Sequence, residues 1–322
     1  MTARVLRPAV DTVEIANSLL SGLTEEPTFA LRGRRVPRGF GRIAIGPFAP
    51  EPPDLPFRSQ RRAYNVGPMA SAERIAGWMR RQLGGAGARG FVVGLSGGVD
   101  SAVVARLAQL AAPGNVVAAI LPCHSDPADD RDAATIAAHF SLPAVRIDLA
   151  DAYDVLVRGA QRALNDLPEQ MRAAPPADPL RARVPLANIK PRLRMTTLYF
   201  LANSLNYLVA GGGNRSELSI GYFTKYGDGA ADLLPIGHLV KSEVRVLARE
   251  LKVPEEIVER TPSAGLWIGQ SDEEEMGFTY AELERYLEDG PQGVPPALAM
   301  RIERLTRGTE HKRALPPVPD QD

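Results

Sequence analysis

The chain of 322 residues is long enough for one large domain or two ordinary ones, and its 44% apolar and 24% charged residues are typical of a globular protein. Its 38 Lys and Arg residues equal its 38 Asp and Glu residues, so no net charge favours binding to nucleic acid or to an anionic membrane. The single cysteine excludes an internal disulfide framework, and the absence of a long apolar run or a signal-peptide core predicts a cytoplasmic location.

Residues 1–66 differ in composition from the rest of the chain. They contain ten arginines, no lysine, and eight of the 28 prolines. Little apolar periodicity follows Leu23, which predicts a Pro/Arg-rich, poorly folded extension. A basic arm that touches RNA or a partner subunit is the alternative. We expect residues 67–322 to form the folded domain.

From Ser71 onward the pattern becomes regular, and apolar residues on one face predict a first helix. Short β-branched runs predict buried strands, and helical stretches alternate with them. The expected strands are 91–95, 116–121 and 144–149, and the expected helices are 100–112, 130–140 and 151–164. Farther along come a proline-rich loop at 167–190, a helix from Pro191, an apolar run at 205–213, and helices near 240–251 and 279–288.

The alternation of strands and helices predicts an α/β fold. Parallel strands joined by right-handed crossovers give a doubly wound, mostly parallel sheet flanked by helices. In such a sheet the ligand binds at the carboxyl ends of the strands.

A glycine-rich loop, "GLSGGVDSAV" at 94–103, lies between the first strand and the next helix. Helix N-termini bind anions through free N–H groups and the helix dipole. Gly97 and Gly98 allow close approach of the backbone, and Ser96 and Ser101 add hydroxyl donors. The loop lacks the lysine of a Walker motif and does not fit GxGxxG.

Asp100 is the residue of this loop that decides its chemistry. A carboxylate beside phosphates repels them unless a cation lies between, so Asp100 either caps the helix or holds Mg²⁺ that bridges to the phosphates. The stretch "SGGVDS" resembles the signature of the ATP pyrophosphatase superfamily, whose fold is adenine-nucleotide α-hydrolase-like. That resemblance implies cleavage of ATP between the α and β phosphates.

Four further stretches narrow the resemblance to the NAD synthetases. They are "NIKPRLRMTTLYFLAN" (188–203), "NRSELSIGYFTKYGDGAADLLPIGHLVKSEV" (214–244), "TPSAGLWIGQSDEEEMGFTY" (261–280) and "TEHKR" (309–313). With the loop, the likeness covers roughly 69–315. It implies amidation of deamido-NAD to NAD through an acyl-adenylate, with ATP as co-substrate, Mg²⁺ as cofactor, and release of AMP and pyrophosphate.

The resemblance also implies roles for individual residues. Asp100, Lys241 and Asp232 are the expected catalytic residues, and Asp100 with Glu217 is the expected metal pair. The expected contacts to ATP come from Gly94, Leu95, Ser96, Gly97, Gly98, Val99, Asp100, Ser101, Gly212, Lys241 and Ser263. The expected contacts to deamido-NAD come from Arg192, Lys225, Asp232, His311 and Lys312.

Each of these residues also has an ordinary structural interpretation. Lysines and arginines are usually solvated surface charges, and Glu217 fits a solvent-facing helix position. Gly212 stands where many members carry a threonine, which leaves one adenine or ribose contact open. Cys123 fits a structural cysteine better than a reactive thiol. The acidic segment "QSDEEEMG" is interpreted as a lid that excludes water from the adenylate.

Free ammonia is the expected nitrogen donor, because residues 1–66 contain no cysteine for a glutamine-hydrolysing domain; delivery by a separate protein is the alternative. Expected partners are small molecules and a second copy of the chain, since the resemblance implies a homodimer, with no nucleic acid or membrane. Two other interpretations remain open. One is a related ATP pyrophosphatase that adenylates another substrate, and the other is a nucleotide-binding protein without turnover.

Overall fold

The computed structural model describes residues 68–172, 179–267 and 269–319. The expectation for residues 1–66 therefore lies outside the described residues. The helices, in chain order, are α2 (Pro68–Ala86), α3 (Val99–Ala111), α4 (Pro127–His139), α5 (Ala150–Asn165), α6 (Pro179–Ala187), α7 (Ile189–Leu205), α8 (Arg215–Ile220), α9 (Lys241–Glu250), α10 (Glu255–Val258), α11 (Asp272–Met276), α12 (Tyr280–Asp289) and α13 (Pro296–Gly308). Three short 3₁₀ turns lie at Glu169–Met171, Pro291–Gly293 and Glu310–Lys312.

Four parallel strands form the central sheet, in the order β3-β2-β1-β4. They are β1 (Gly90–Gly94), β2 (Val116–Ile120), β3 (Ala144–Arg146) and β4 (Tyr207–Val209). The expected doubly wound α/β fold is confirmed. Neighbouring β1 residues point to opposite faces, since Phe91 and Val93 join one buried apolar cluster and Val92 joins another.

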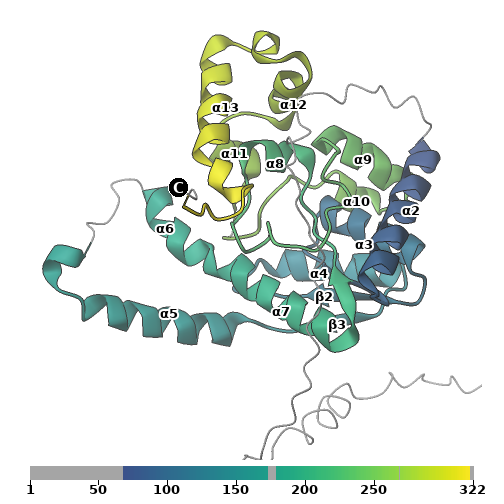
Figure 1. Ribbon diagram of the computed structural model, residues 1–322, viewed down its shortest axis with the longest axis horizontal. Helices are drawn as coiled ribbons and strands as arrows, with labels where there is room; N and C mark the ends of the chain where they lie inside the picture. The colour runs from purple at the N-terminus through teal and green to yellow at the C-terminus, as the bar shows by residue number, and fades with distance from the viewer. Residues whose placement is uncertain (1–67, 173–178, 268, 320–322) are drawn as a thin grey trace, which may run out of the picture. The chain divides into compact units, whose positions relative to one another are not determined.

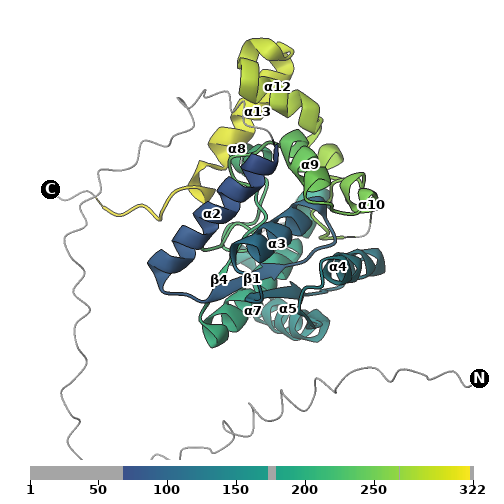
Figure 2. The same cartoon turned by 90° about the vertical axis from the view of Figure 1, so that its right-hand side faces the viewer.

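Helices cover both faces of the sheet (Figures 1 and 2). One cluster packs residues of α2, α3, α4 and α9 against the sheet, and the other packs α7 against it. A third cluster joins α8, α11, α12 and α13 at the C-terminal end of the chain. Among the described residues, no helix combines the length and apolar character of a membrane span.

The chain between β3 and α7 departs most from the sequence expectations. The expected loop at 167–190 contains α6, a helix that accommodates Pro185 in its interior. The strand expected over 144–149 is assigned only to Ala144–Arg146, although Ile147 N and Leu149 N still donate to Ile120 O at the end of β2 and to Pro122 O just after it. Helix α13 was not expected because its start is rich in glycine and proline, yet a proline suits the first turn of a helix.

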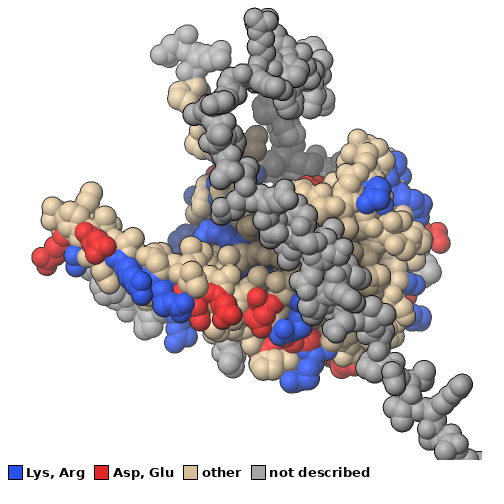
Figure 3. Space-filling view, turned by 90° about the horizontal axis from the view of Figure 1, so that it is seen from below, with Lys and Arg blue, Asp and Glu red and all other residues tan. Residues whose placement is uncertain are grey.

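Helix α5 buries none of its residues in this chain. It extends with α6 away from the sheet (Figure 1), and charged side chains follow one side of this arm (Figure 3). Val155, Leu156 and Leu164 are 62%, 49% and 59% exposed along it. Large apolar side chains gathered on an exposed element indicate an interaction surface.

Candidate active site

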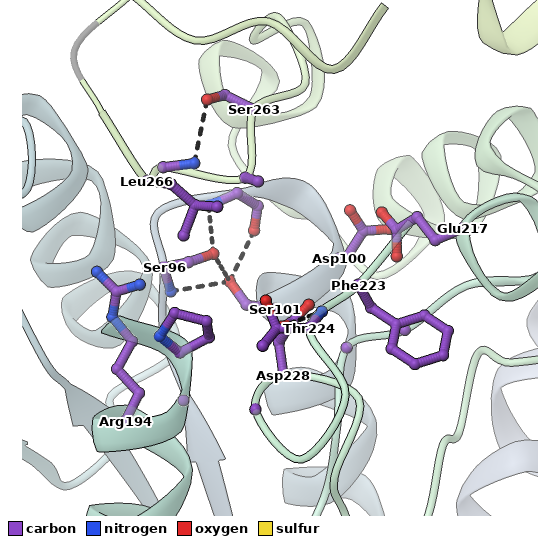
Figure 4. A pocket seen from close by; sticks show the side chains of 18 of the residues that line it. Ser96, Asp100, Ser101, Arg194, Glu217, Phe223, Thr224, Asp228, Ser263 and Leu266 are labelled. Carbon is purple, nitrogen blue, oxygen red and sulfur yellow. Dashed lines mark hydrogen bonds between the residues drawn. The ribbon is translucent and has the colours of Figure 1, made fainter. Parts of the chain in front are cut away.

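A cavity of about 450 Å³ opens at the carboxyl ends of β1, β2 and β4. Its walls come from the glycine loop, the segment after β2, the first half of α7, and residues of the segments at 209–213, 217–230 and 260–267. This is the edge at which an open α/β sheet binds ligands. Figure 4 shows the loop residues Ser96 and Ser101 near the centre of the pocket.

The glycine loop holds its shape through its own hydroxyl groups. Ser101 Oγ donates to Gly98 O at 2.8 Å and lies 3.2 Å from Ser96 Oγ. Gly98 N donates to Ser96 Oγ at 3.3 Å. Helix α3 begins at Val99 without a side-chain cap, so the N–H groups of its first turn remain available to an anion.

Gly97 is required by both backbone conformation and space. Its φ is +81°, and a Cβ there would lie 2.7 Å from Asp129 O. We expect Gly97→Ala to lower the free energy of unfolding by about 2–4 kcal/mol, because left-handed strain and a backbone clash add. Gly114→Ala is the matched control, since its φ is +76° but nothing lies within 4 Å. Denaturant unfolding of both variants measures the difference, and equal losses would refute the clash.

Asp100, Glu217 and Lys241 form the charged centre of the site. Lys241 Nζ donates to Asp100 Oδ2 and lies 3.9 Å from Glu217 Oε1. Asp100 makes no bond to the backbone of its own helix in the described contacts; instead its Oδ1 accepts from Asn214 Nδ2 at 3.1 Å. The helix-cap interpretation of Asp100 therefore has no support in this geometry.

The local sequence of α8 explains how Glu217 reaches this centre. Asn214 Oδ1 accepts from Glu217 N at 3.1 Å, and Glu217 Oε2 accepts from Asn214 N at 3.2 Å, which is a capping box. Lys241 begins α9, and its backbone N donates to Ser216 Oγ at 3.2 Å. One short helix thus positions both the carboxylate and the lysine, and its N-cap Asn214 and its Ser216 are buried.

The electrostatics of this centre follow from its burial. Burial raises the pKa of Glu217 to about 8; the Asp100 charge adds to the rise, and Lys241 opposes it. Burial disfavours the charge of Lys241, yet the two carboxylates raise its pKa above the ordinary value. Behind the lysine, Asp272 accepts from Tyr280 Oη at 2.9 Å and from Tyr222 Oη at 3.2 Å. The Tyr280 ring lies 5.3 Å from Lys241 Nζ.

Most of the residues expected to contact ATP or the metal ion line the pocket. The expected residues that line it are Gly94, Leu95, Ser96, Gly98, Val99, Asp100, Ser101, Gly212, Glu217, Lys241, Ser263 and Lys312. Gly97 supports the loop from behind. In the part of the chain that the structure describes, no group of three or more His, Cys, Asp or Glu side chains could hold a metal ion. Several other acidic residues line the pocket, but Asp100 and Glu217 are the two carboxylates that Lys241 brings together beside the glycine loop.

Of the expected substrate residues, only Lys312 lines this pocket; the others follow or precede lining residues in the chain. Arg192 donates to Lys225 O at 3.3 Å, and Lys225 Nζ donates to His311 O at 2.5 Å. Lys312 Nζ donates to Gly221 O at 2.7 Å and Phe223 O at 2.6 Å, which fastens the C-terminal segment to the region after α8. Helix α7, the segment at 221–225 and the 3₁₀ turn at Glu310–Lys312 are thereby joined through lysine and arginine side chains.

Asp232 is exposed and is held at the end of β4. Its Oδ2 accepts from Val209 N at 2.7 Å, and its Oδ1 accepts from Tyr199 Oη at 3.3 Å. Because the carboxylate ties its own segment to the end of β4 and to α7, it serves the local fold. A role toward substrate stays a prediction.

Gly212 lies beside the first turn of α3. A Cβ there would lie 3.9 Å from both Asp100 Cβ and Ser101 N. We therefore expect Gly212→Thr to change the unfolding free energy by less than about 1 kcal/mol. Gly211→Ala is the contrasting variant, because its Cβ would lie 2.7 Å from Ala231 Cβ and should cost about 1–3 kcal/mol. Thermal unfolding compares them, and a large loss in Gly212→Thr would contradict the available space.

Cys123 and the acidic segment "QSDEEEMG" both lie near the pocket-lining segments and are packed into the fold. Cys123 is fully buried among apolar residues, and burial raises the pKa of its thiol, so the structural interpretation holds. The acidic segment expected as a lid forms α11, and its ends Asp272 and Met276 are buried. In this conformation it is a packed helix, while the segment before it, which includes Ser263, lines the pocket.

Sequence reasoning missed several polar residues at the site. Asn214 positions Asp100 and Glu217, and Arg194 and Arg260 line the pocket. Arginine and asparagine are common on surfaces, so their identity alone carries no signal of burial. For Asn214, the only signal was its place three residues before Glu217, the spacing of a capping box.

The chain is similar in sequence and in structure to known proteins. The model of the NAD synthase family matches residues 71–316. An NH3-dependent NAD+ synthetase from Carboxydothermus hydrogenoformans is 49% identical over 247 residues, which cover 77% of this chain and 96% of that protein. The structure of NMN synthetase from Francisella tularensis has a TM-score of 0.71 and 35% identity, covering 80% of this chain and 100% of that one. NAD+ synthetase from Burkholderia pseudomallei has a TM-score of 0.61 and 34% identity, covering 78% and 91%.

Proposed function

The chain belongs to the NAD synthase family, and from this membership and its pocket we propose that it converts deamido-NAD to NAD with ATP and ammonia. The observation that carries the proposal is the Asp100–Lys241–Glu217 cluster beside a glycine loop at the N-terminus of α3. A polyanion seated there meets free N–H groups, hydroxyls and an ammonium group.

The reaction has two steps. A carboxylate oxygen of deamido-NAD attacks the α-phosphorus of ATP; an O–P bond forms, and the bond to the bridging oxygen of pyrophosphate breaks. Ammonia then attacks the acyl carbon; a C–N bond forms, the bond to the AMP oxygen breaks, and the nitrogen loses a proton. The glycine loop holds the β and γ phosphates, and Lys241 provides positive charge where two anions must approach.

The donors at the charged centre fit a divalent cation such as Mg²⁺. Mg²⁺ is commonly held by one or two carboxylates together with substrate phosphates, and Asp100 and Glu217 supply two carboxylates beside the loop. Asn214 orients both of them. When bound, the ion would neutralise phosphate charge. Lys241 would keep its position through Ser216 and the Tyr280 ring.

We also propose a homodimer. Arg192, Lys225, Asp232 and His311 lie outside the pocket, so a complete deamido-NAD site needs another surface against them. The exposed apolar side chains of α5 offer such a contact. A cytoplasmic location, favoured by the sequence, stays a prediction.

Val155→Asp should dissociate this dimer, because a carboxylate buried at an apolar interface lacks a partner. Sedimentation would show the wild-type chain at twice the monomer mass and the variant at the monomer mass. Val246→Asp, on α9 and 52% exposed, is the matched control and should stay dimeric. A wild-type monomer under assay conditions would contradict the dimer.

The function is tested by mixing the protein with ATP, Mg²⁺, deamido-NAD and an ammonium salt, and by following NAD and pyrophosphate together. One pyrophosphate for each NAD is expected, and glutamine should not replace ammonium. Pyrophosphate without NAD would point to another acceptor, and neither product would point to a binding protein without turnover.

A second candidate substrate is the mononucleotide acid that corresponds to NMN. The similarity to NMN synthetase from Francisella tularensis, with its TM-score of 0.71, favours testing it. A parallel assay with nicotinate mononucleotide compares kcat/KM for the two acids. A higher value for the mononucleotide would replace deamido-NAD as the substrate.

A further inference from the structure

Arg194 is a pocket cation whose guanidinium is only partly used by the protein. It lies on α7, where Nε donates to Leu121 O at 3.0 Å and Nη2 donates to Ser125 Oγ at 2.9 Å. Both partners belong to the segment that follows β2. Nη1 has no hydrogen-bond partner in the described contacts. It is also not one of the buried, unpartnered polar atoms, so it remains accessible. Arg194 lines the pocket, and Nη1 is the guanidinium nitrogen that its two anchoring bonds leave unused.

The other cations of the pocket are already engaged. Lys241 is paired with Asp100, and Arg260 is paired with Asp129 and with Asp132. Lys312 is held by two carbonyl groups near the C-terminal segment. Within the described residues, no carboxylate lies at salt-bridge distance from Arg194.

An arginine fixed by neutral groups and open to a pocket is suited to an anion. Burial lowers the pKa of Arg194, and the charges of Asp129 and Asp228 oppose this without pairing with the guanidinium. An arginine stays protonated in proteins, so a bound anion would offset the remaining cost of its buried charge. Its two anchoring bonds pre-organise the guanidinium, which reduces the entropy lost on binding.

The position of Arg194 relative to the loop indicates which anion of the reaction it would bind, namely the α-phosphate. Figure 4 shows Arg194 on the side of Ser96, with Asp100 and Glu217 on the other side of the loop. The β and γ phosphates are assigned to the loop and to the Asp100–Lys241 side. The α-phosphate is joined to the β-phosphate through one bridging oxygen. We therefore place it toward the segment after β2, to which Arg194 is hydrogen-bonded.

We propose that Arg194 binds the α-phosphate of ATP and keeps the same contact to the phosphate of the acyl-adenylate. The inference rests on the proposed function. During attack by the pyridine carboxylate, an O–P bond forms as the bond to pyrophosphate breaks, and negative charge remains on the two non-bridging oxygens that Nη1 faces. Arg194 also separates two roles: the loop holds the leaving group, and α7 holds the group that is transferred.

The affinities of AMP and adenosine test this contact, because the two probes differ only in the phosphate. The wild-type protein should bind AMP at least about tenfold more tightly than adenosine, as a charge-assisted hydrogen bond implies. Arg194→Gln should bring the two affinities to within about threefold by weakening AMP alone. Arg194→Lys should keep part of the difference, and Arg304→Gln, at an exposed arginine of α13, should keep all of it.

Three outcomes would overturn the inference. They are equal binding of AMP and adenosine by the wild-type protein, an unchanged ratio in Arg194→Gln, and a parallel loss of both ligands, which would mean that Arg194 only supports the loop after β2. If Arg194→Gln does not fold, an unchanged ratio in Arg194→Lys overturns it instead. Failure of the wild-type protein to make NAD would refute the proposed function. NAD synthesis with an unchanged ratio would refute only the role of Arg194.

Discussion

Asp100→Asn should slow adenylation by at least about 10³-fold, equivalent to about 4 kcal/mol of transition-state stabilisation. The amide keeps the size of the side chain and can still accept the hydrogen bond from Asn214, but it loses the charge that faces Lys241 and the phosphates. In the variant, Lys241 still has the Glu217 carboxylate as a partner, 3.9 Å away. The free energy of unfolding should therefore fall by only about 1–3 kcal/mol.

Deamido-NAD-dependent exchange of labelled pyrophosphate into ATP measures the rate of adenylation, and denaturant unfolding measures stability. Asp151→Asn is the matched control, since it removes an exposed carboxylate from the first turn of α5. It should leave both quantities nearly unchanged. Losses of activity and stability of the same size in Asp100→Asn would return Asp100 to a structural role.

Lys241→Met should abolish measurable NAD synthesis and also weaken the fold. Methionine fills similar space, but Asp100 and Glu217 then face each other without the buried ammonium group. Removing one partner of a buried ion pair costs about 3–5 kcal/mol, and uptake of a proton by one carboxylate reduces this cost. Lys252→Met, at an exposed lysine, should change stability by less than about 0.5 kcal/mol.

The stability of Lys241→Met should depend on pH in a defined direction. Burial and Asp100 already raise the pKa of Glu217 above its ordinary value near 4.5, and loss of Lys241 removes the charge that opposes this rise. The folded state then holds more protons than the unfolded state, so stability falls as pH rises from about 5 to 8. Unfolding at both pH values tests this, and a variant that is less stable at pH 5 would contradict it.

The sequence predicted the glycine loop well because its signal is local. The apolar strand, the glycines and the following helix are contiguous, and position at the carboxyl end of a parallel strand follows from the fold class. Residues expected from the resemblance, such as Lys241 and Glu217, do meet Asp100. Their 141- and 117-residue separations from it give no local pattern that periodicity could detect.

Features that depend on tertiary contacts could not be predicted from the sequence. Arg194 and Asn214 look like surface residues until the segments after β2 and β4 are folded around them. Helix α6 was missed because prolines suggested a loop, although one proline is accommodated inside it. The fastening of α11 through Asp272 depends on two tyrosines, one 50 residues before it in the chain and one 8 residues after it.

The central claim is that the pocket transfers AMP to the pyridine carboxylate before ammonia arrives. Deamido-NAD labelled with ¹⁸O in that carboxylate tests it directly, with mass spectrometry of the products. An acyl-adenylate predicts one ¹⁸O atom in AMP for each NAD formed, because the carboxylate oxygen stays on phosphorus when ammonia displaces AMP. NAD formation with no label in AMP, or with label in pyrophosphate, would contradict the account.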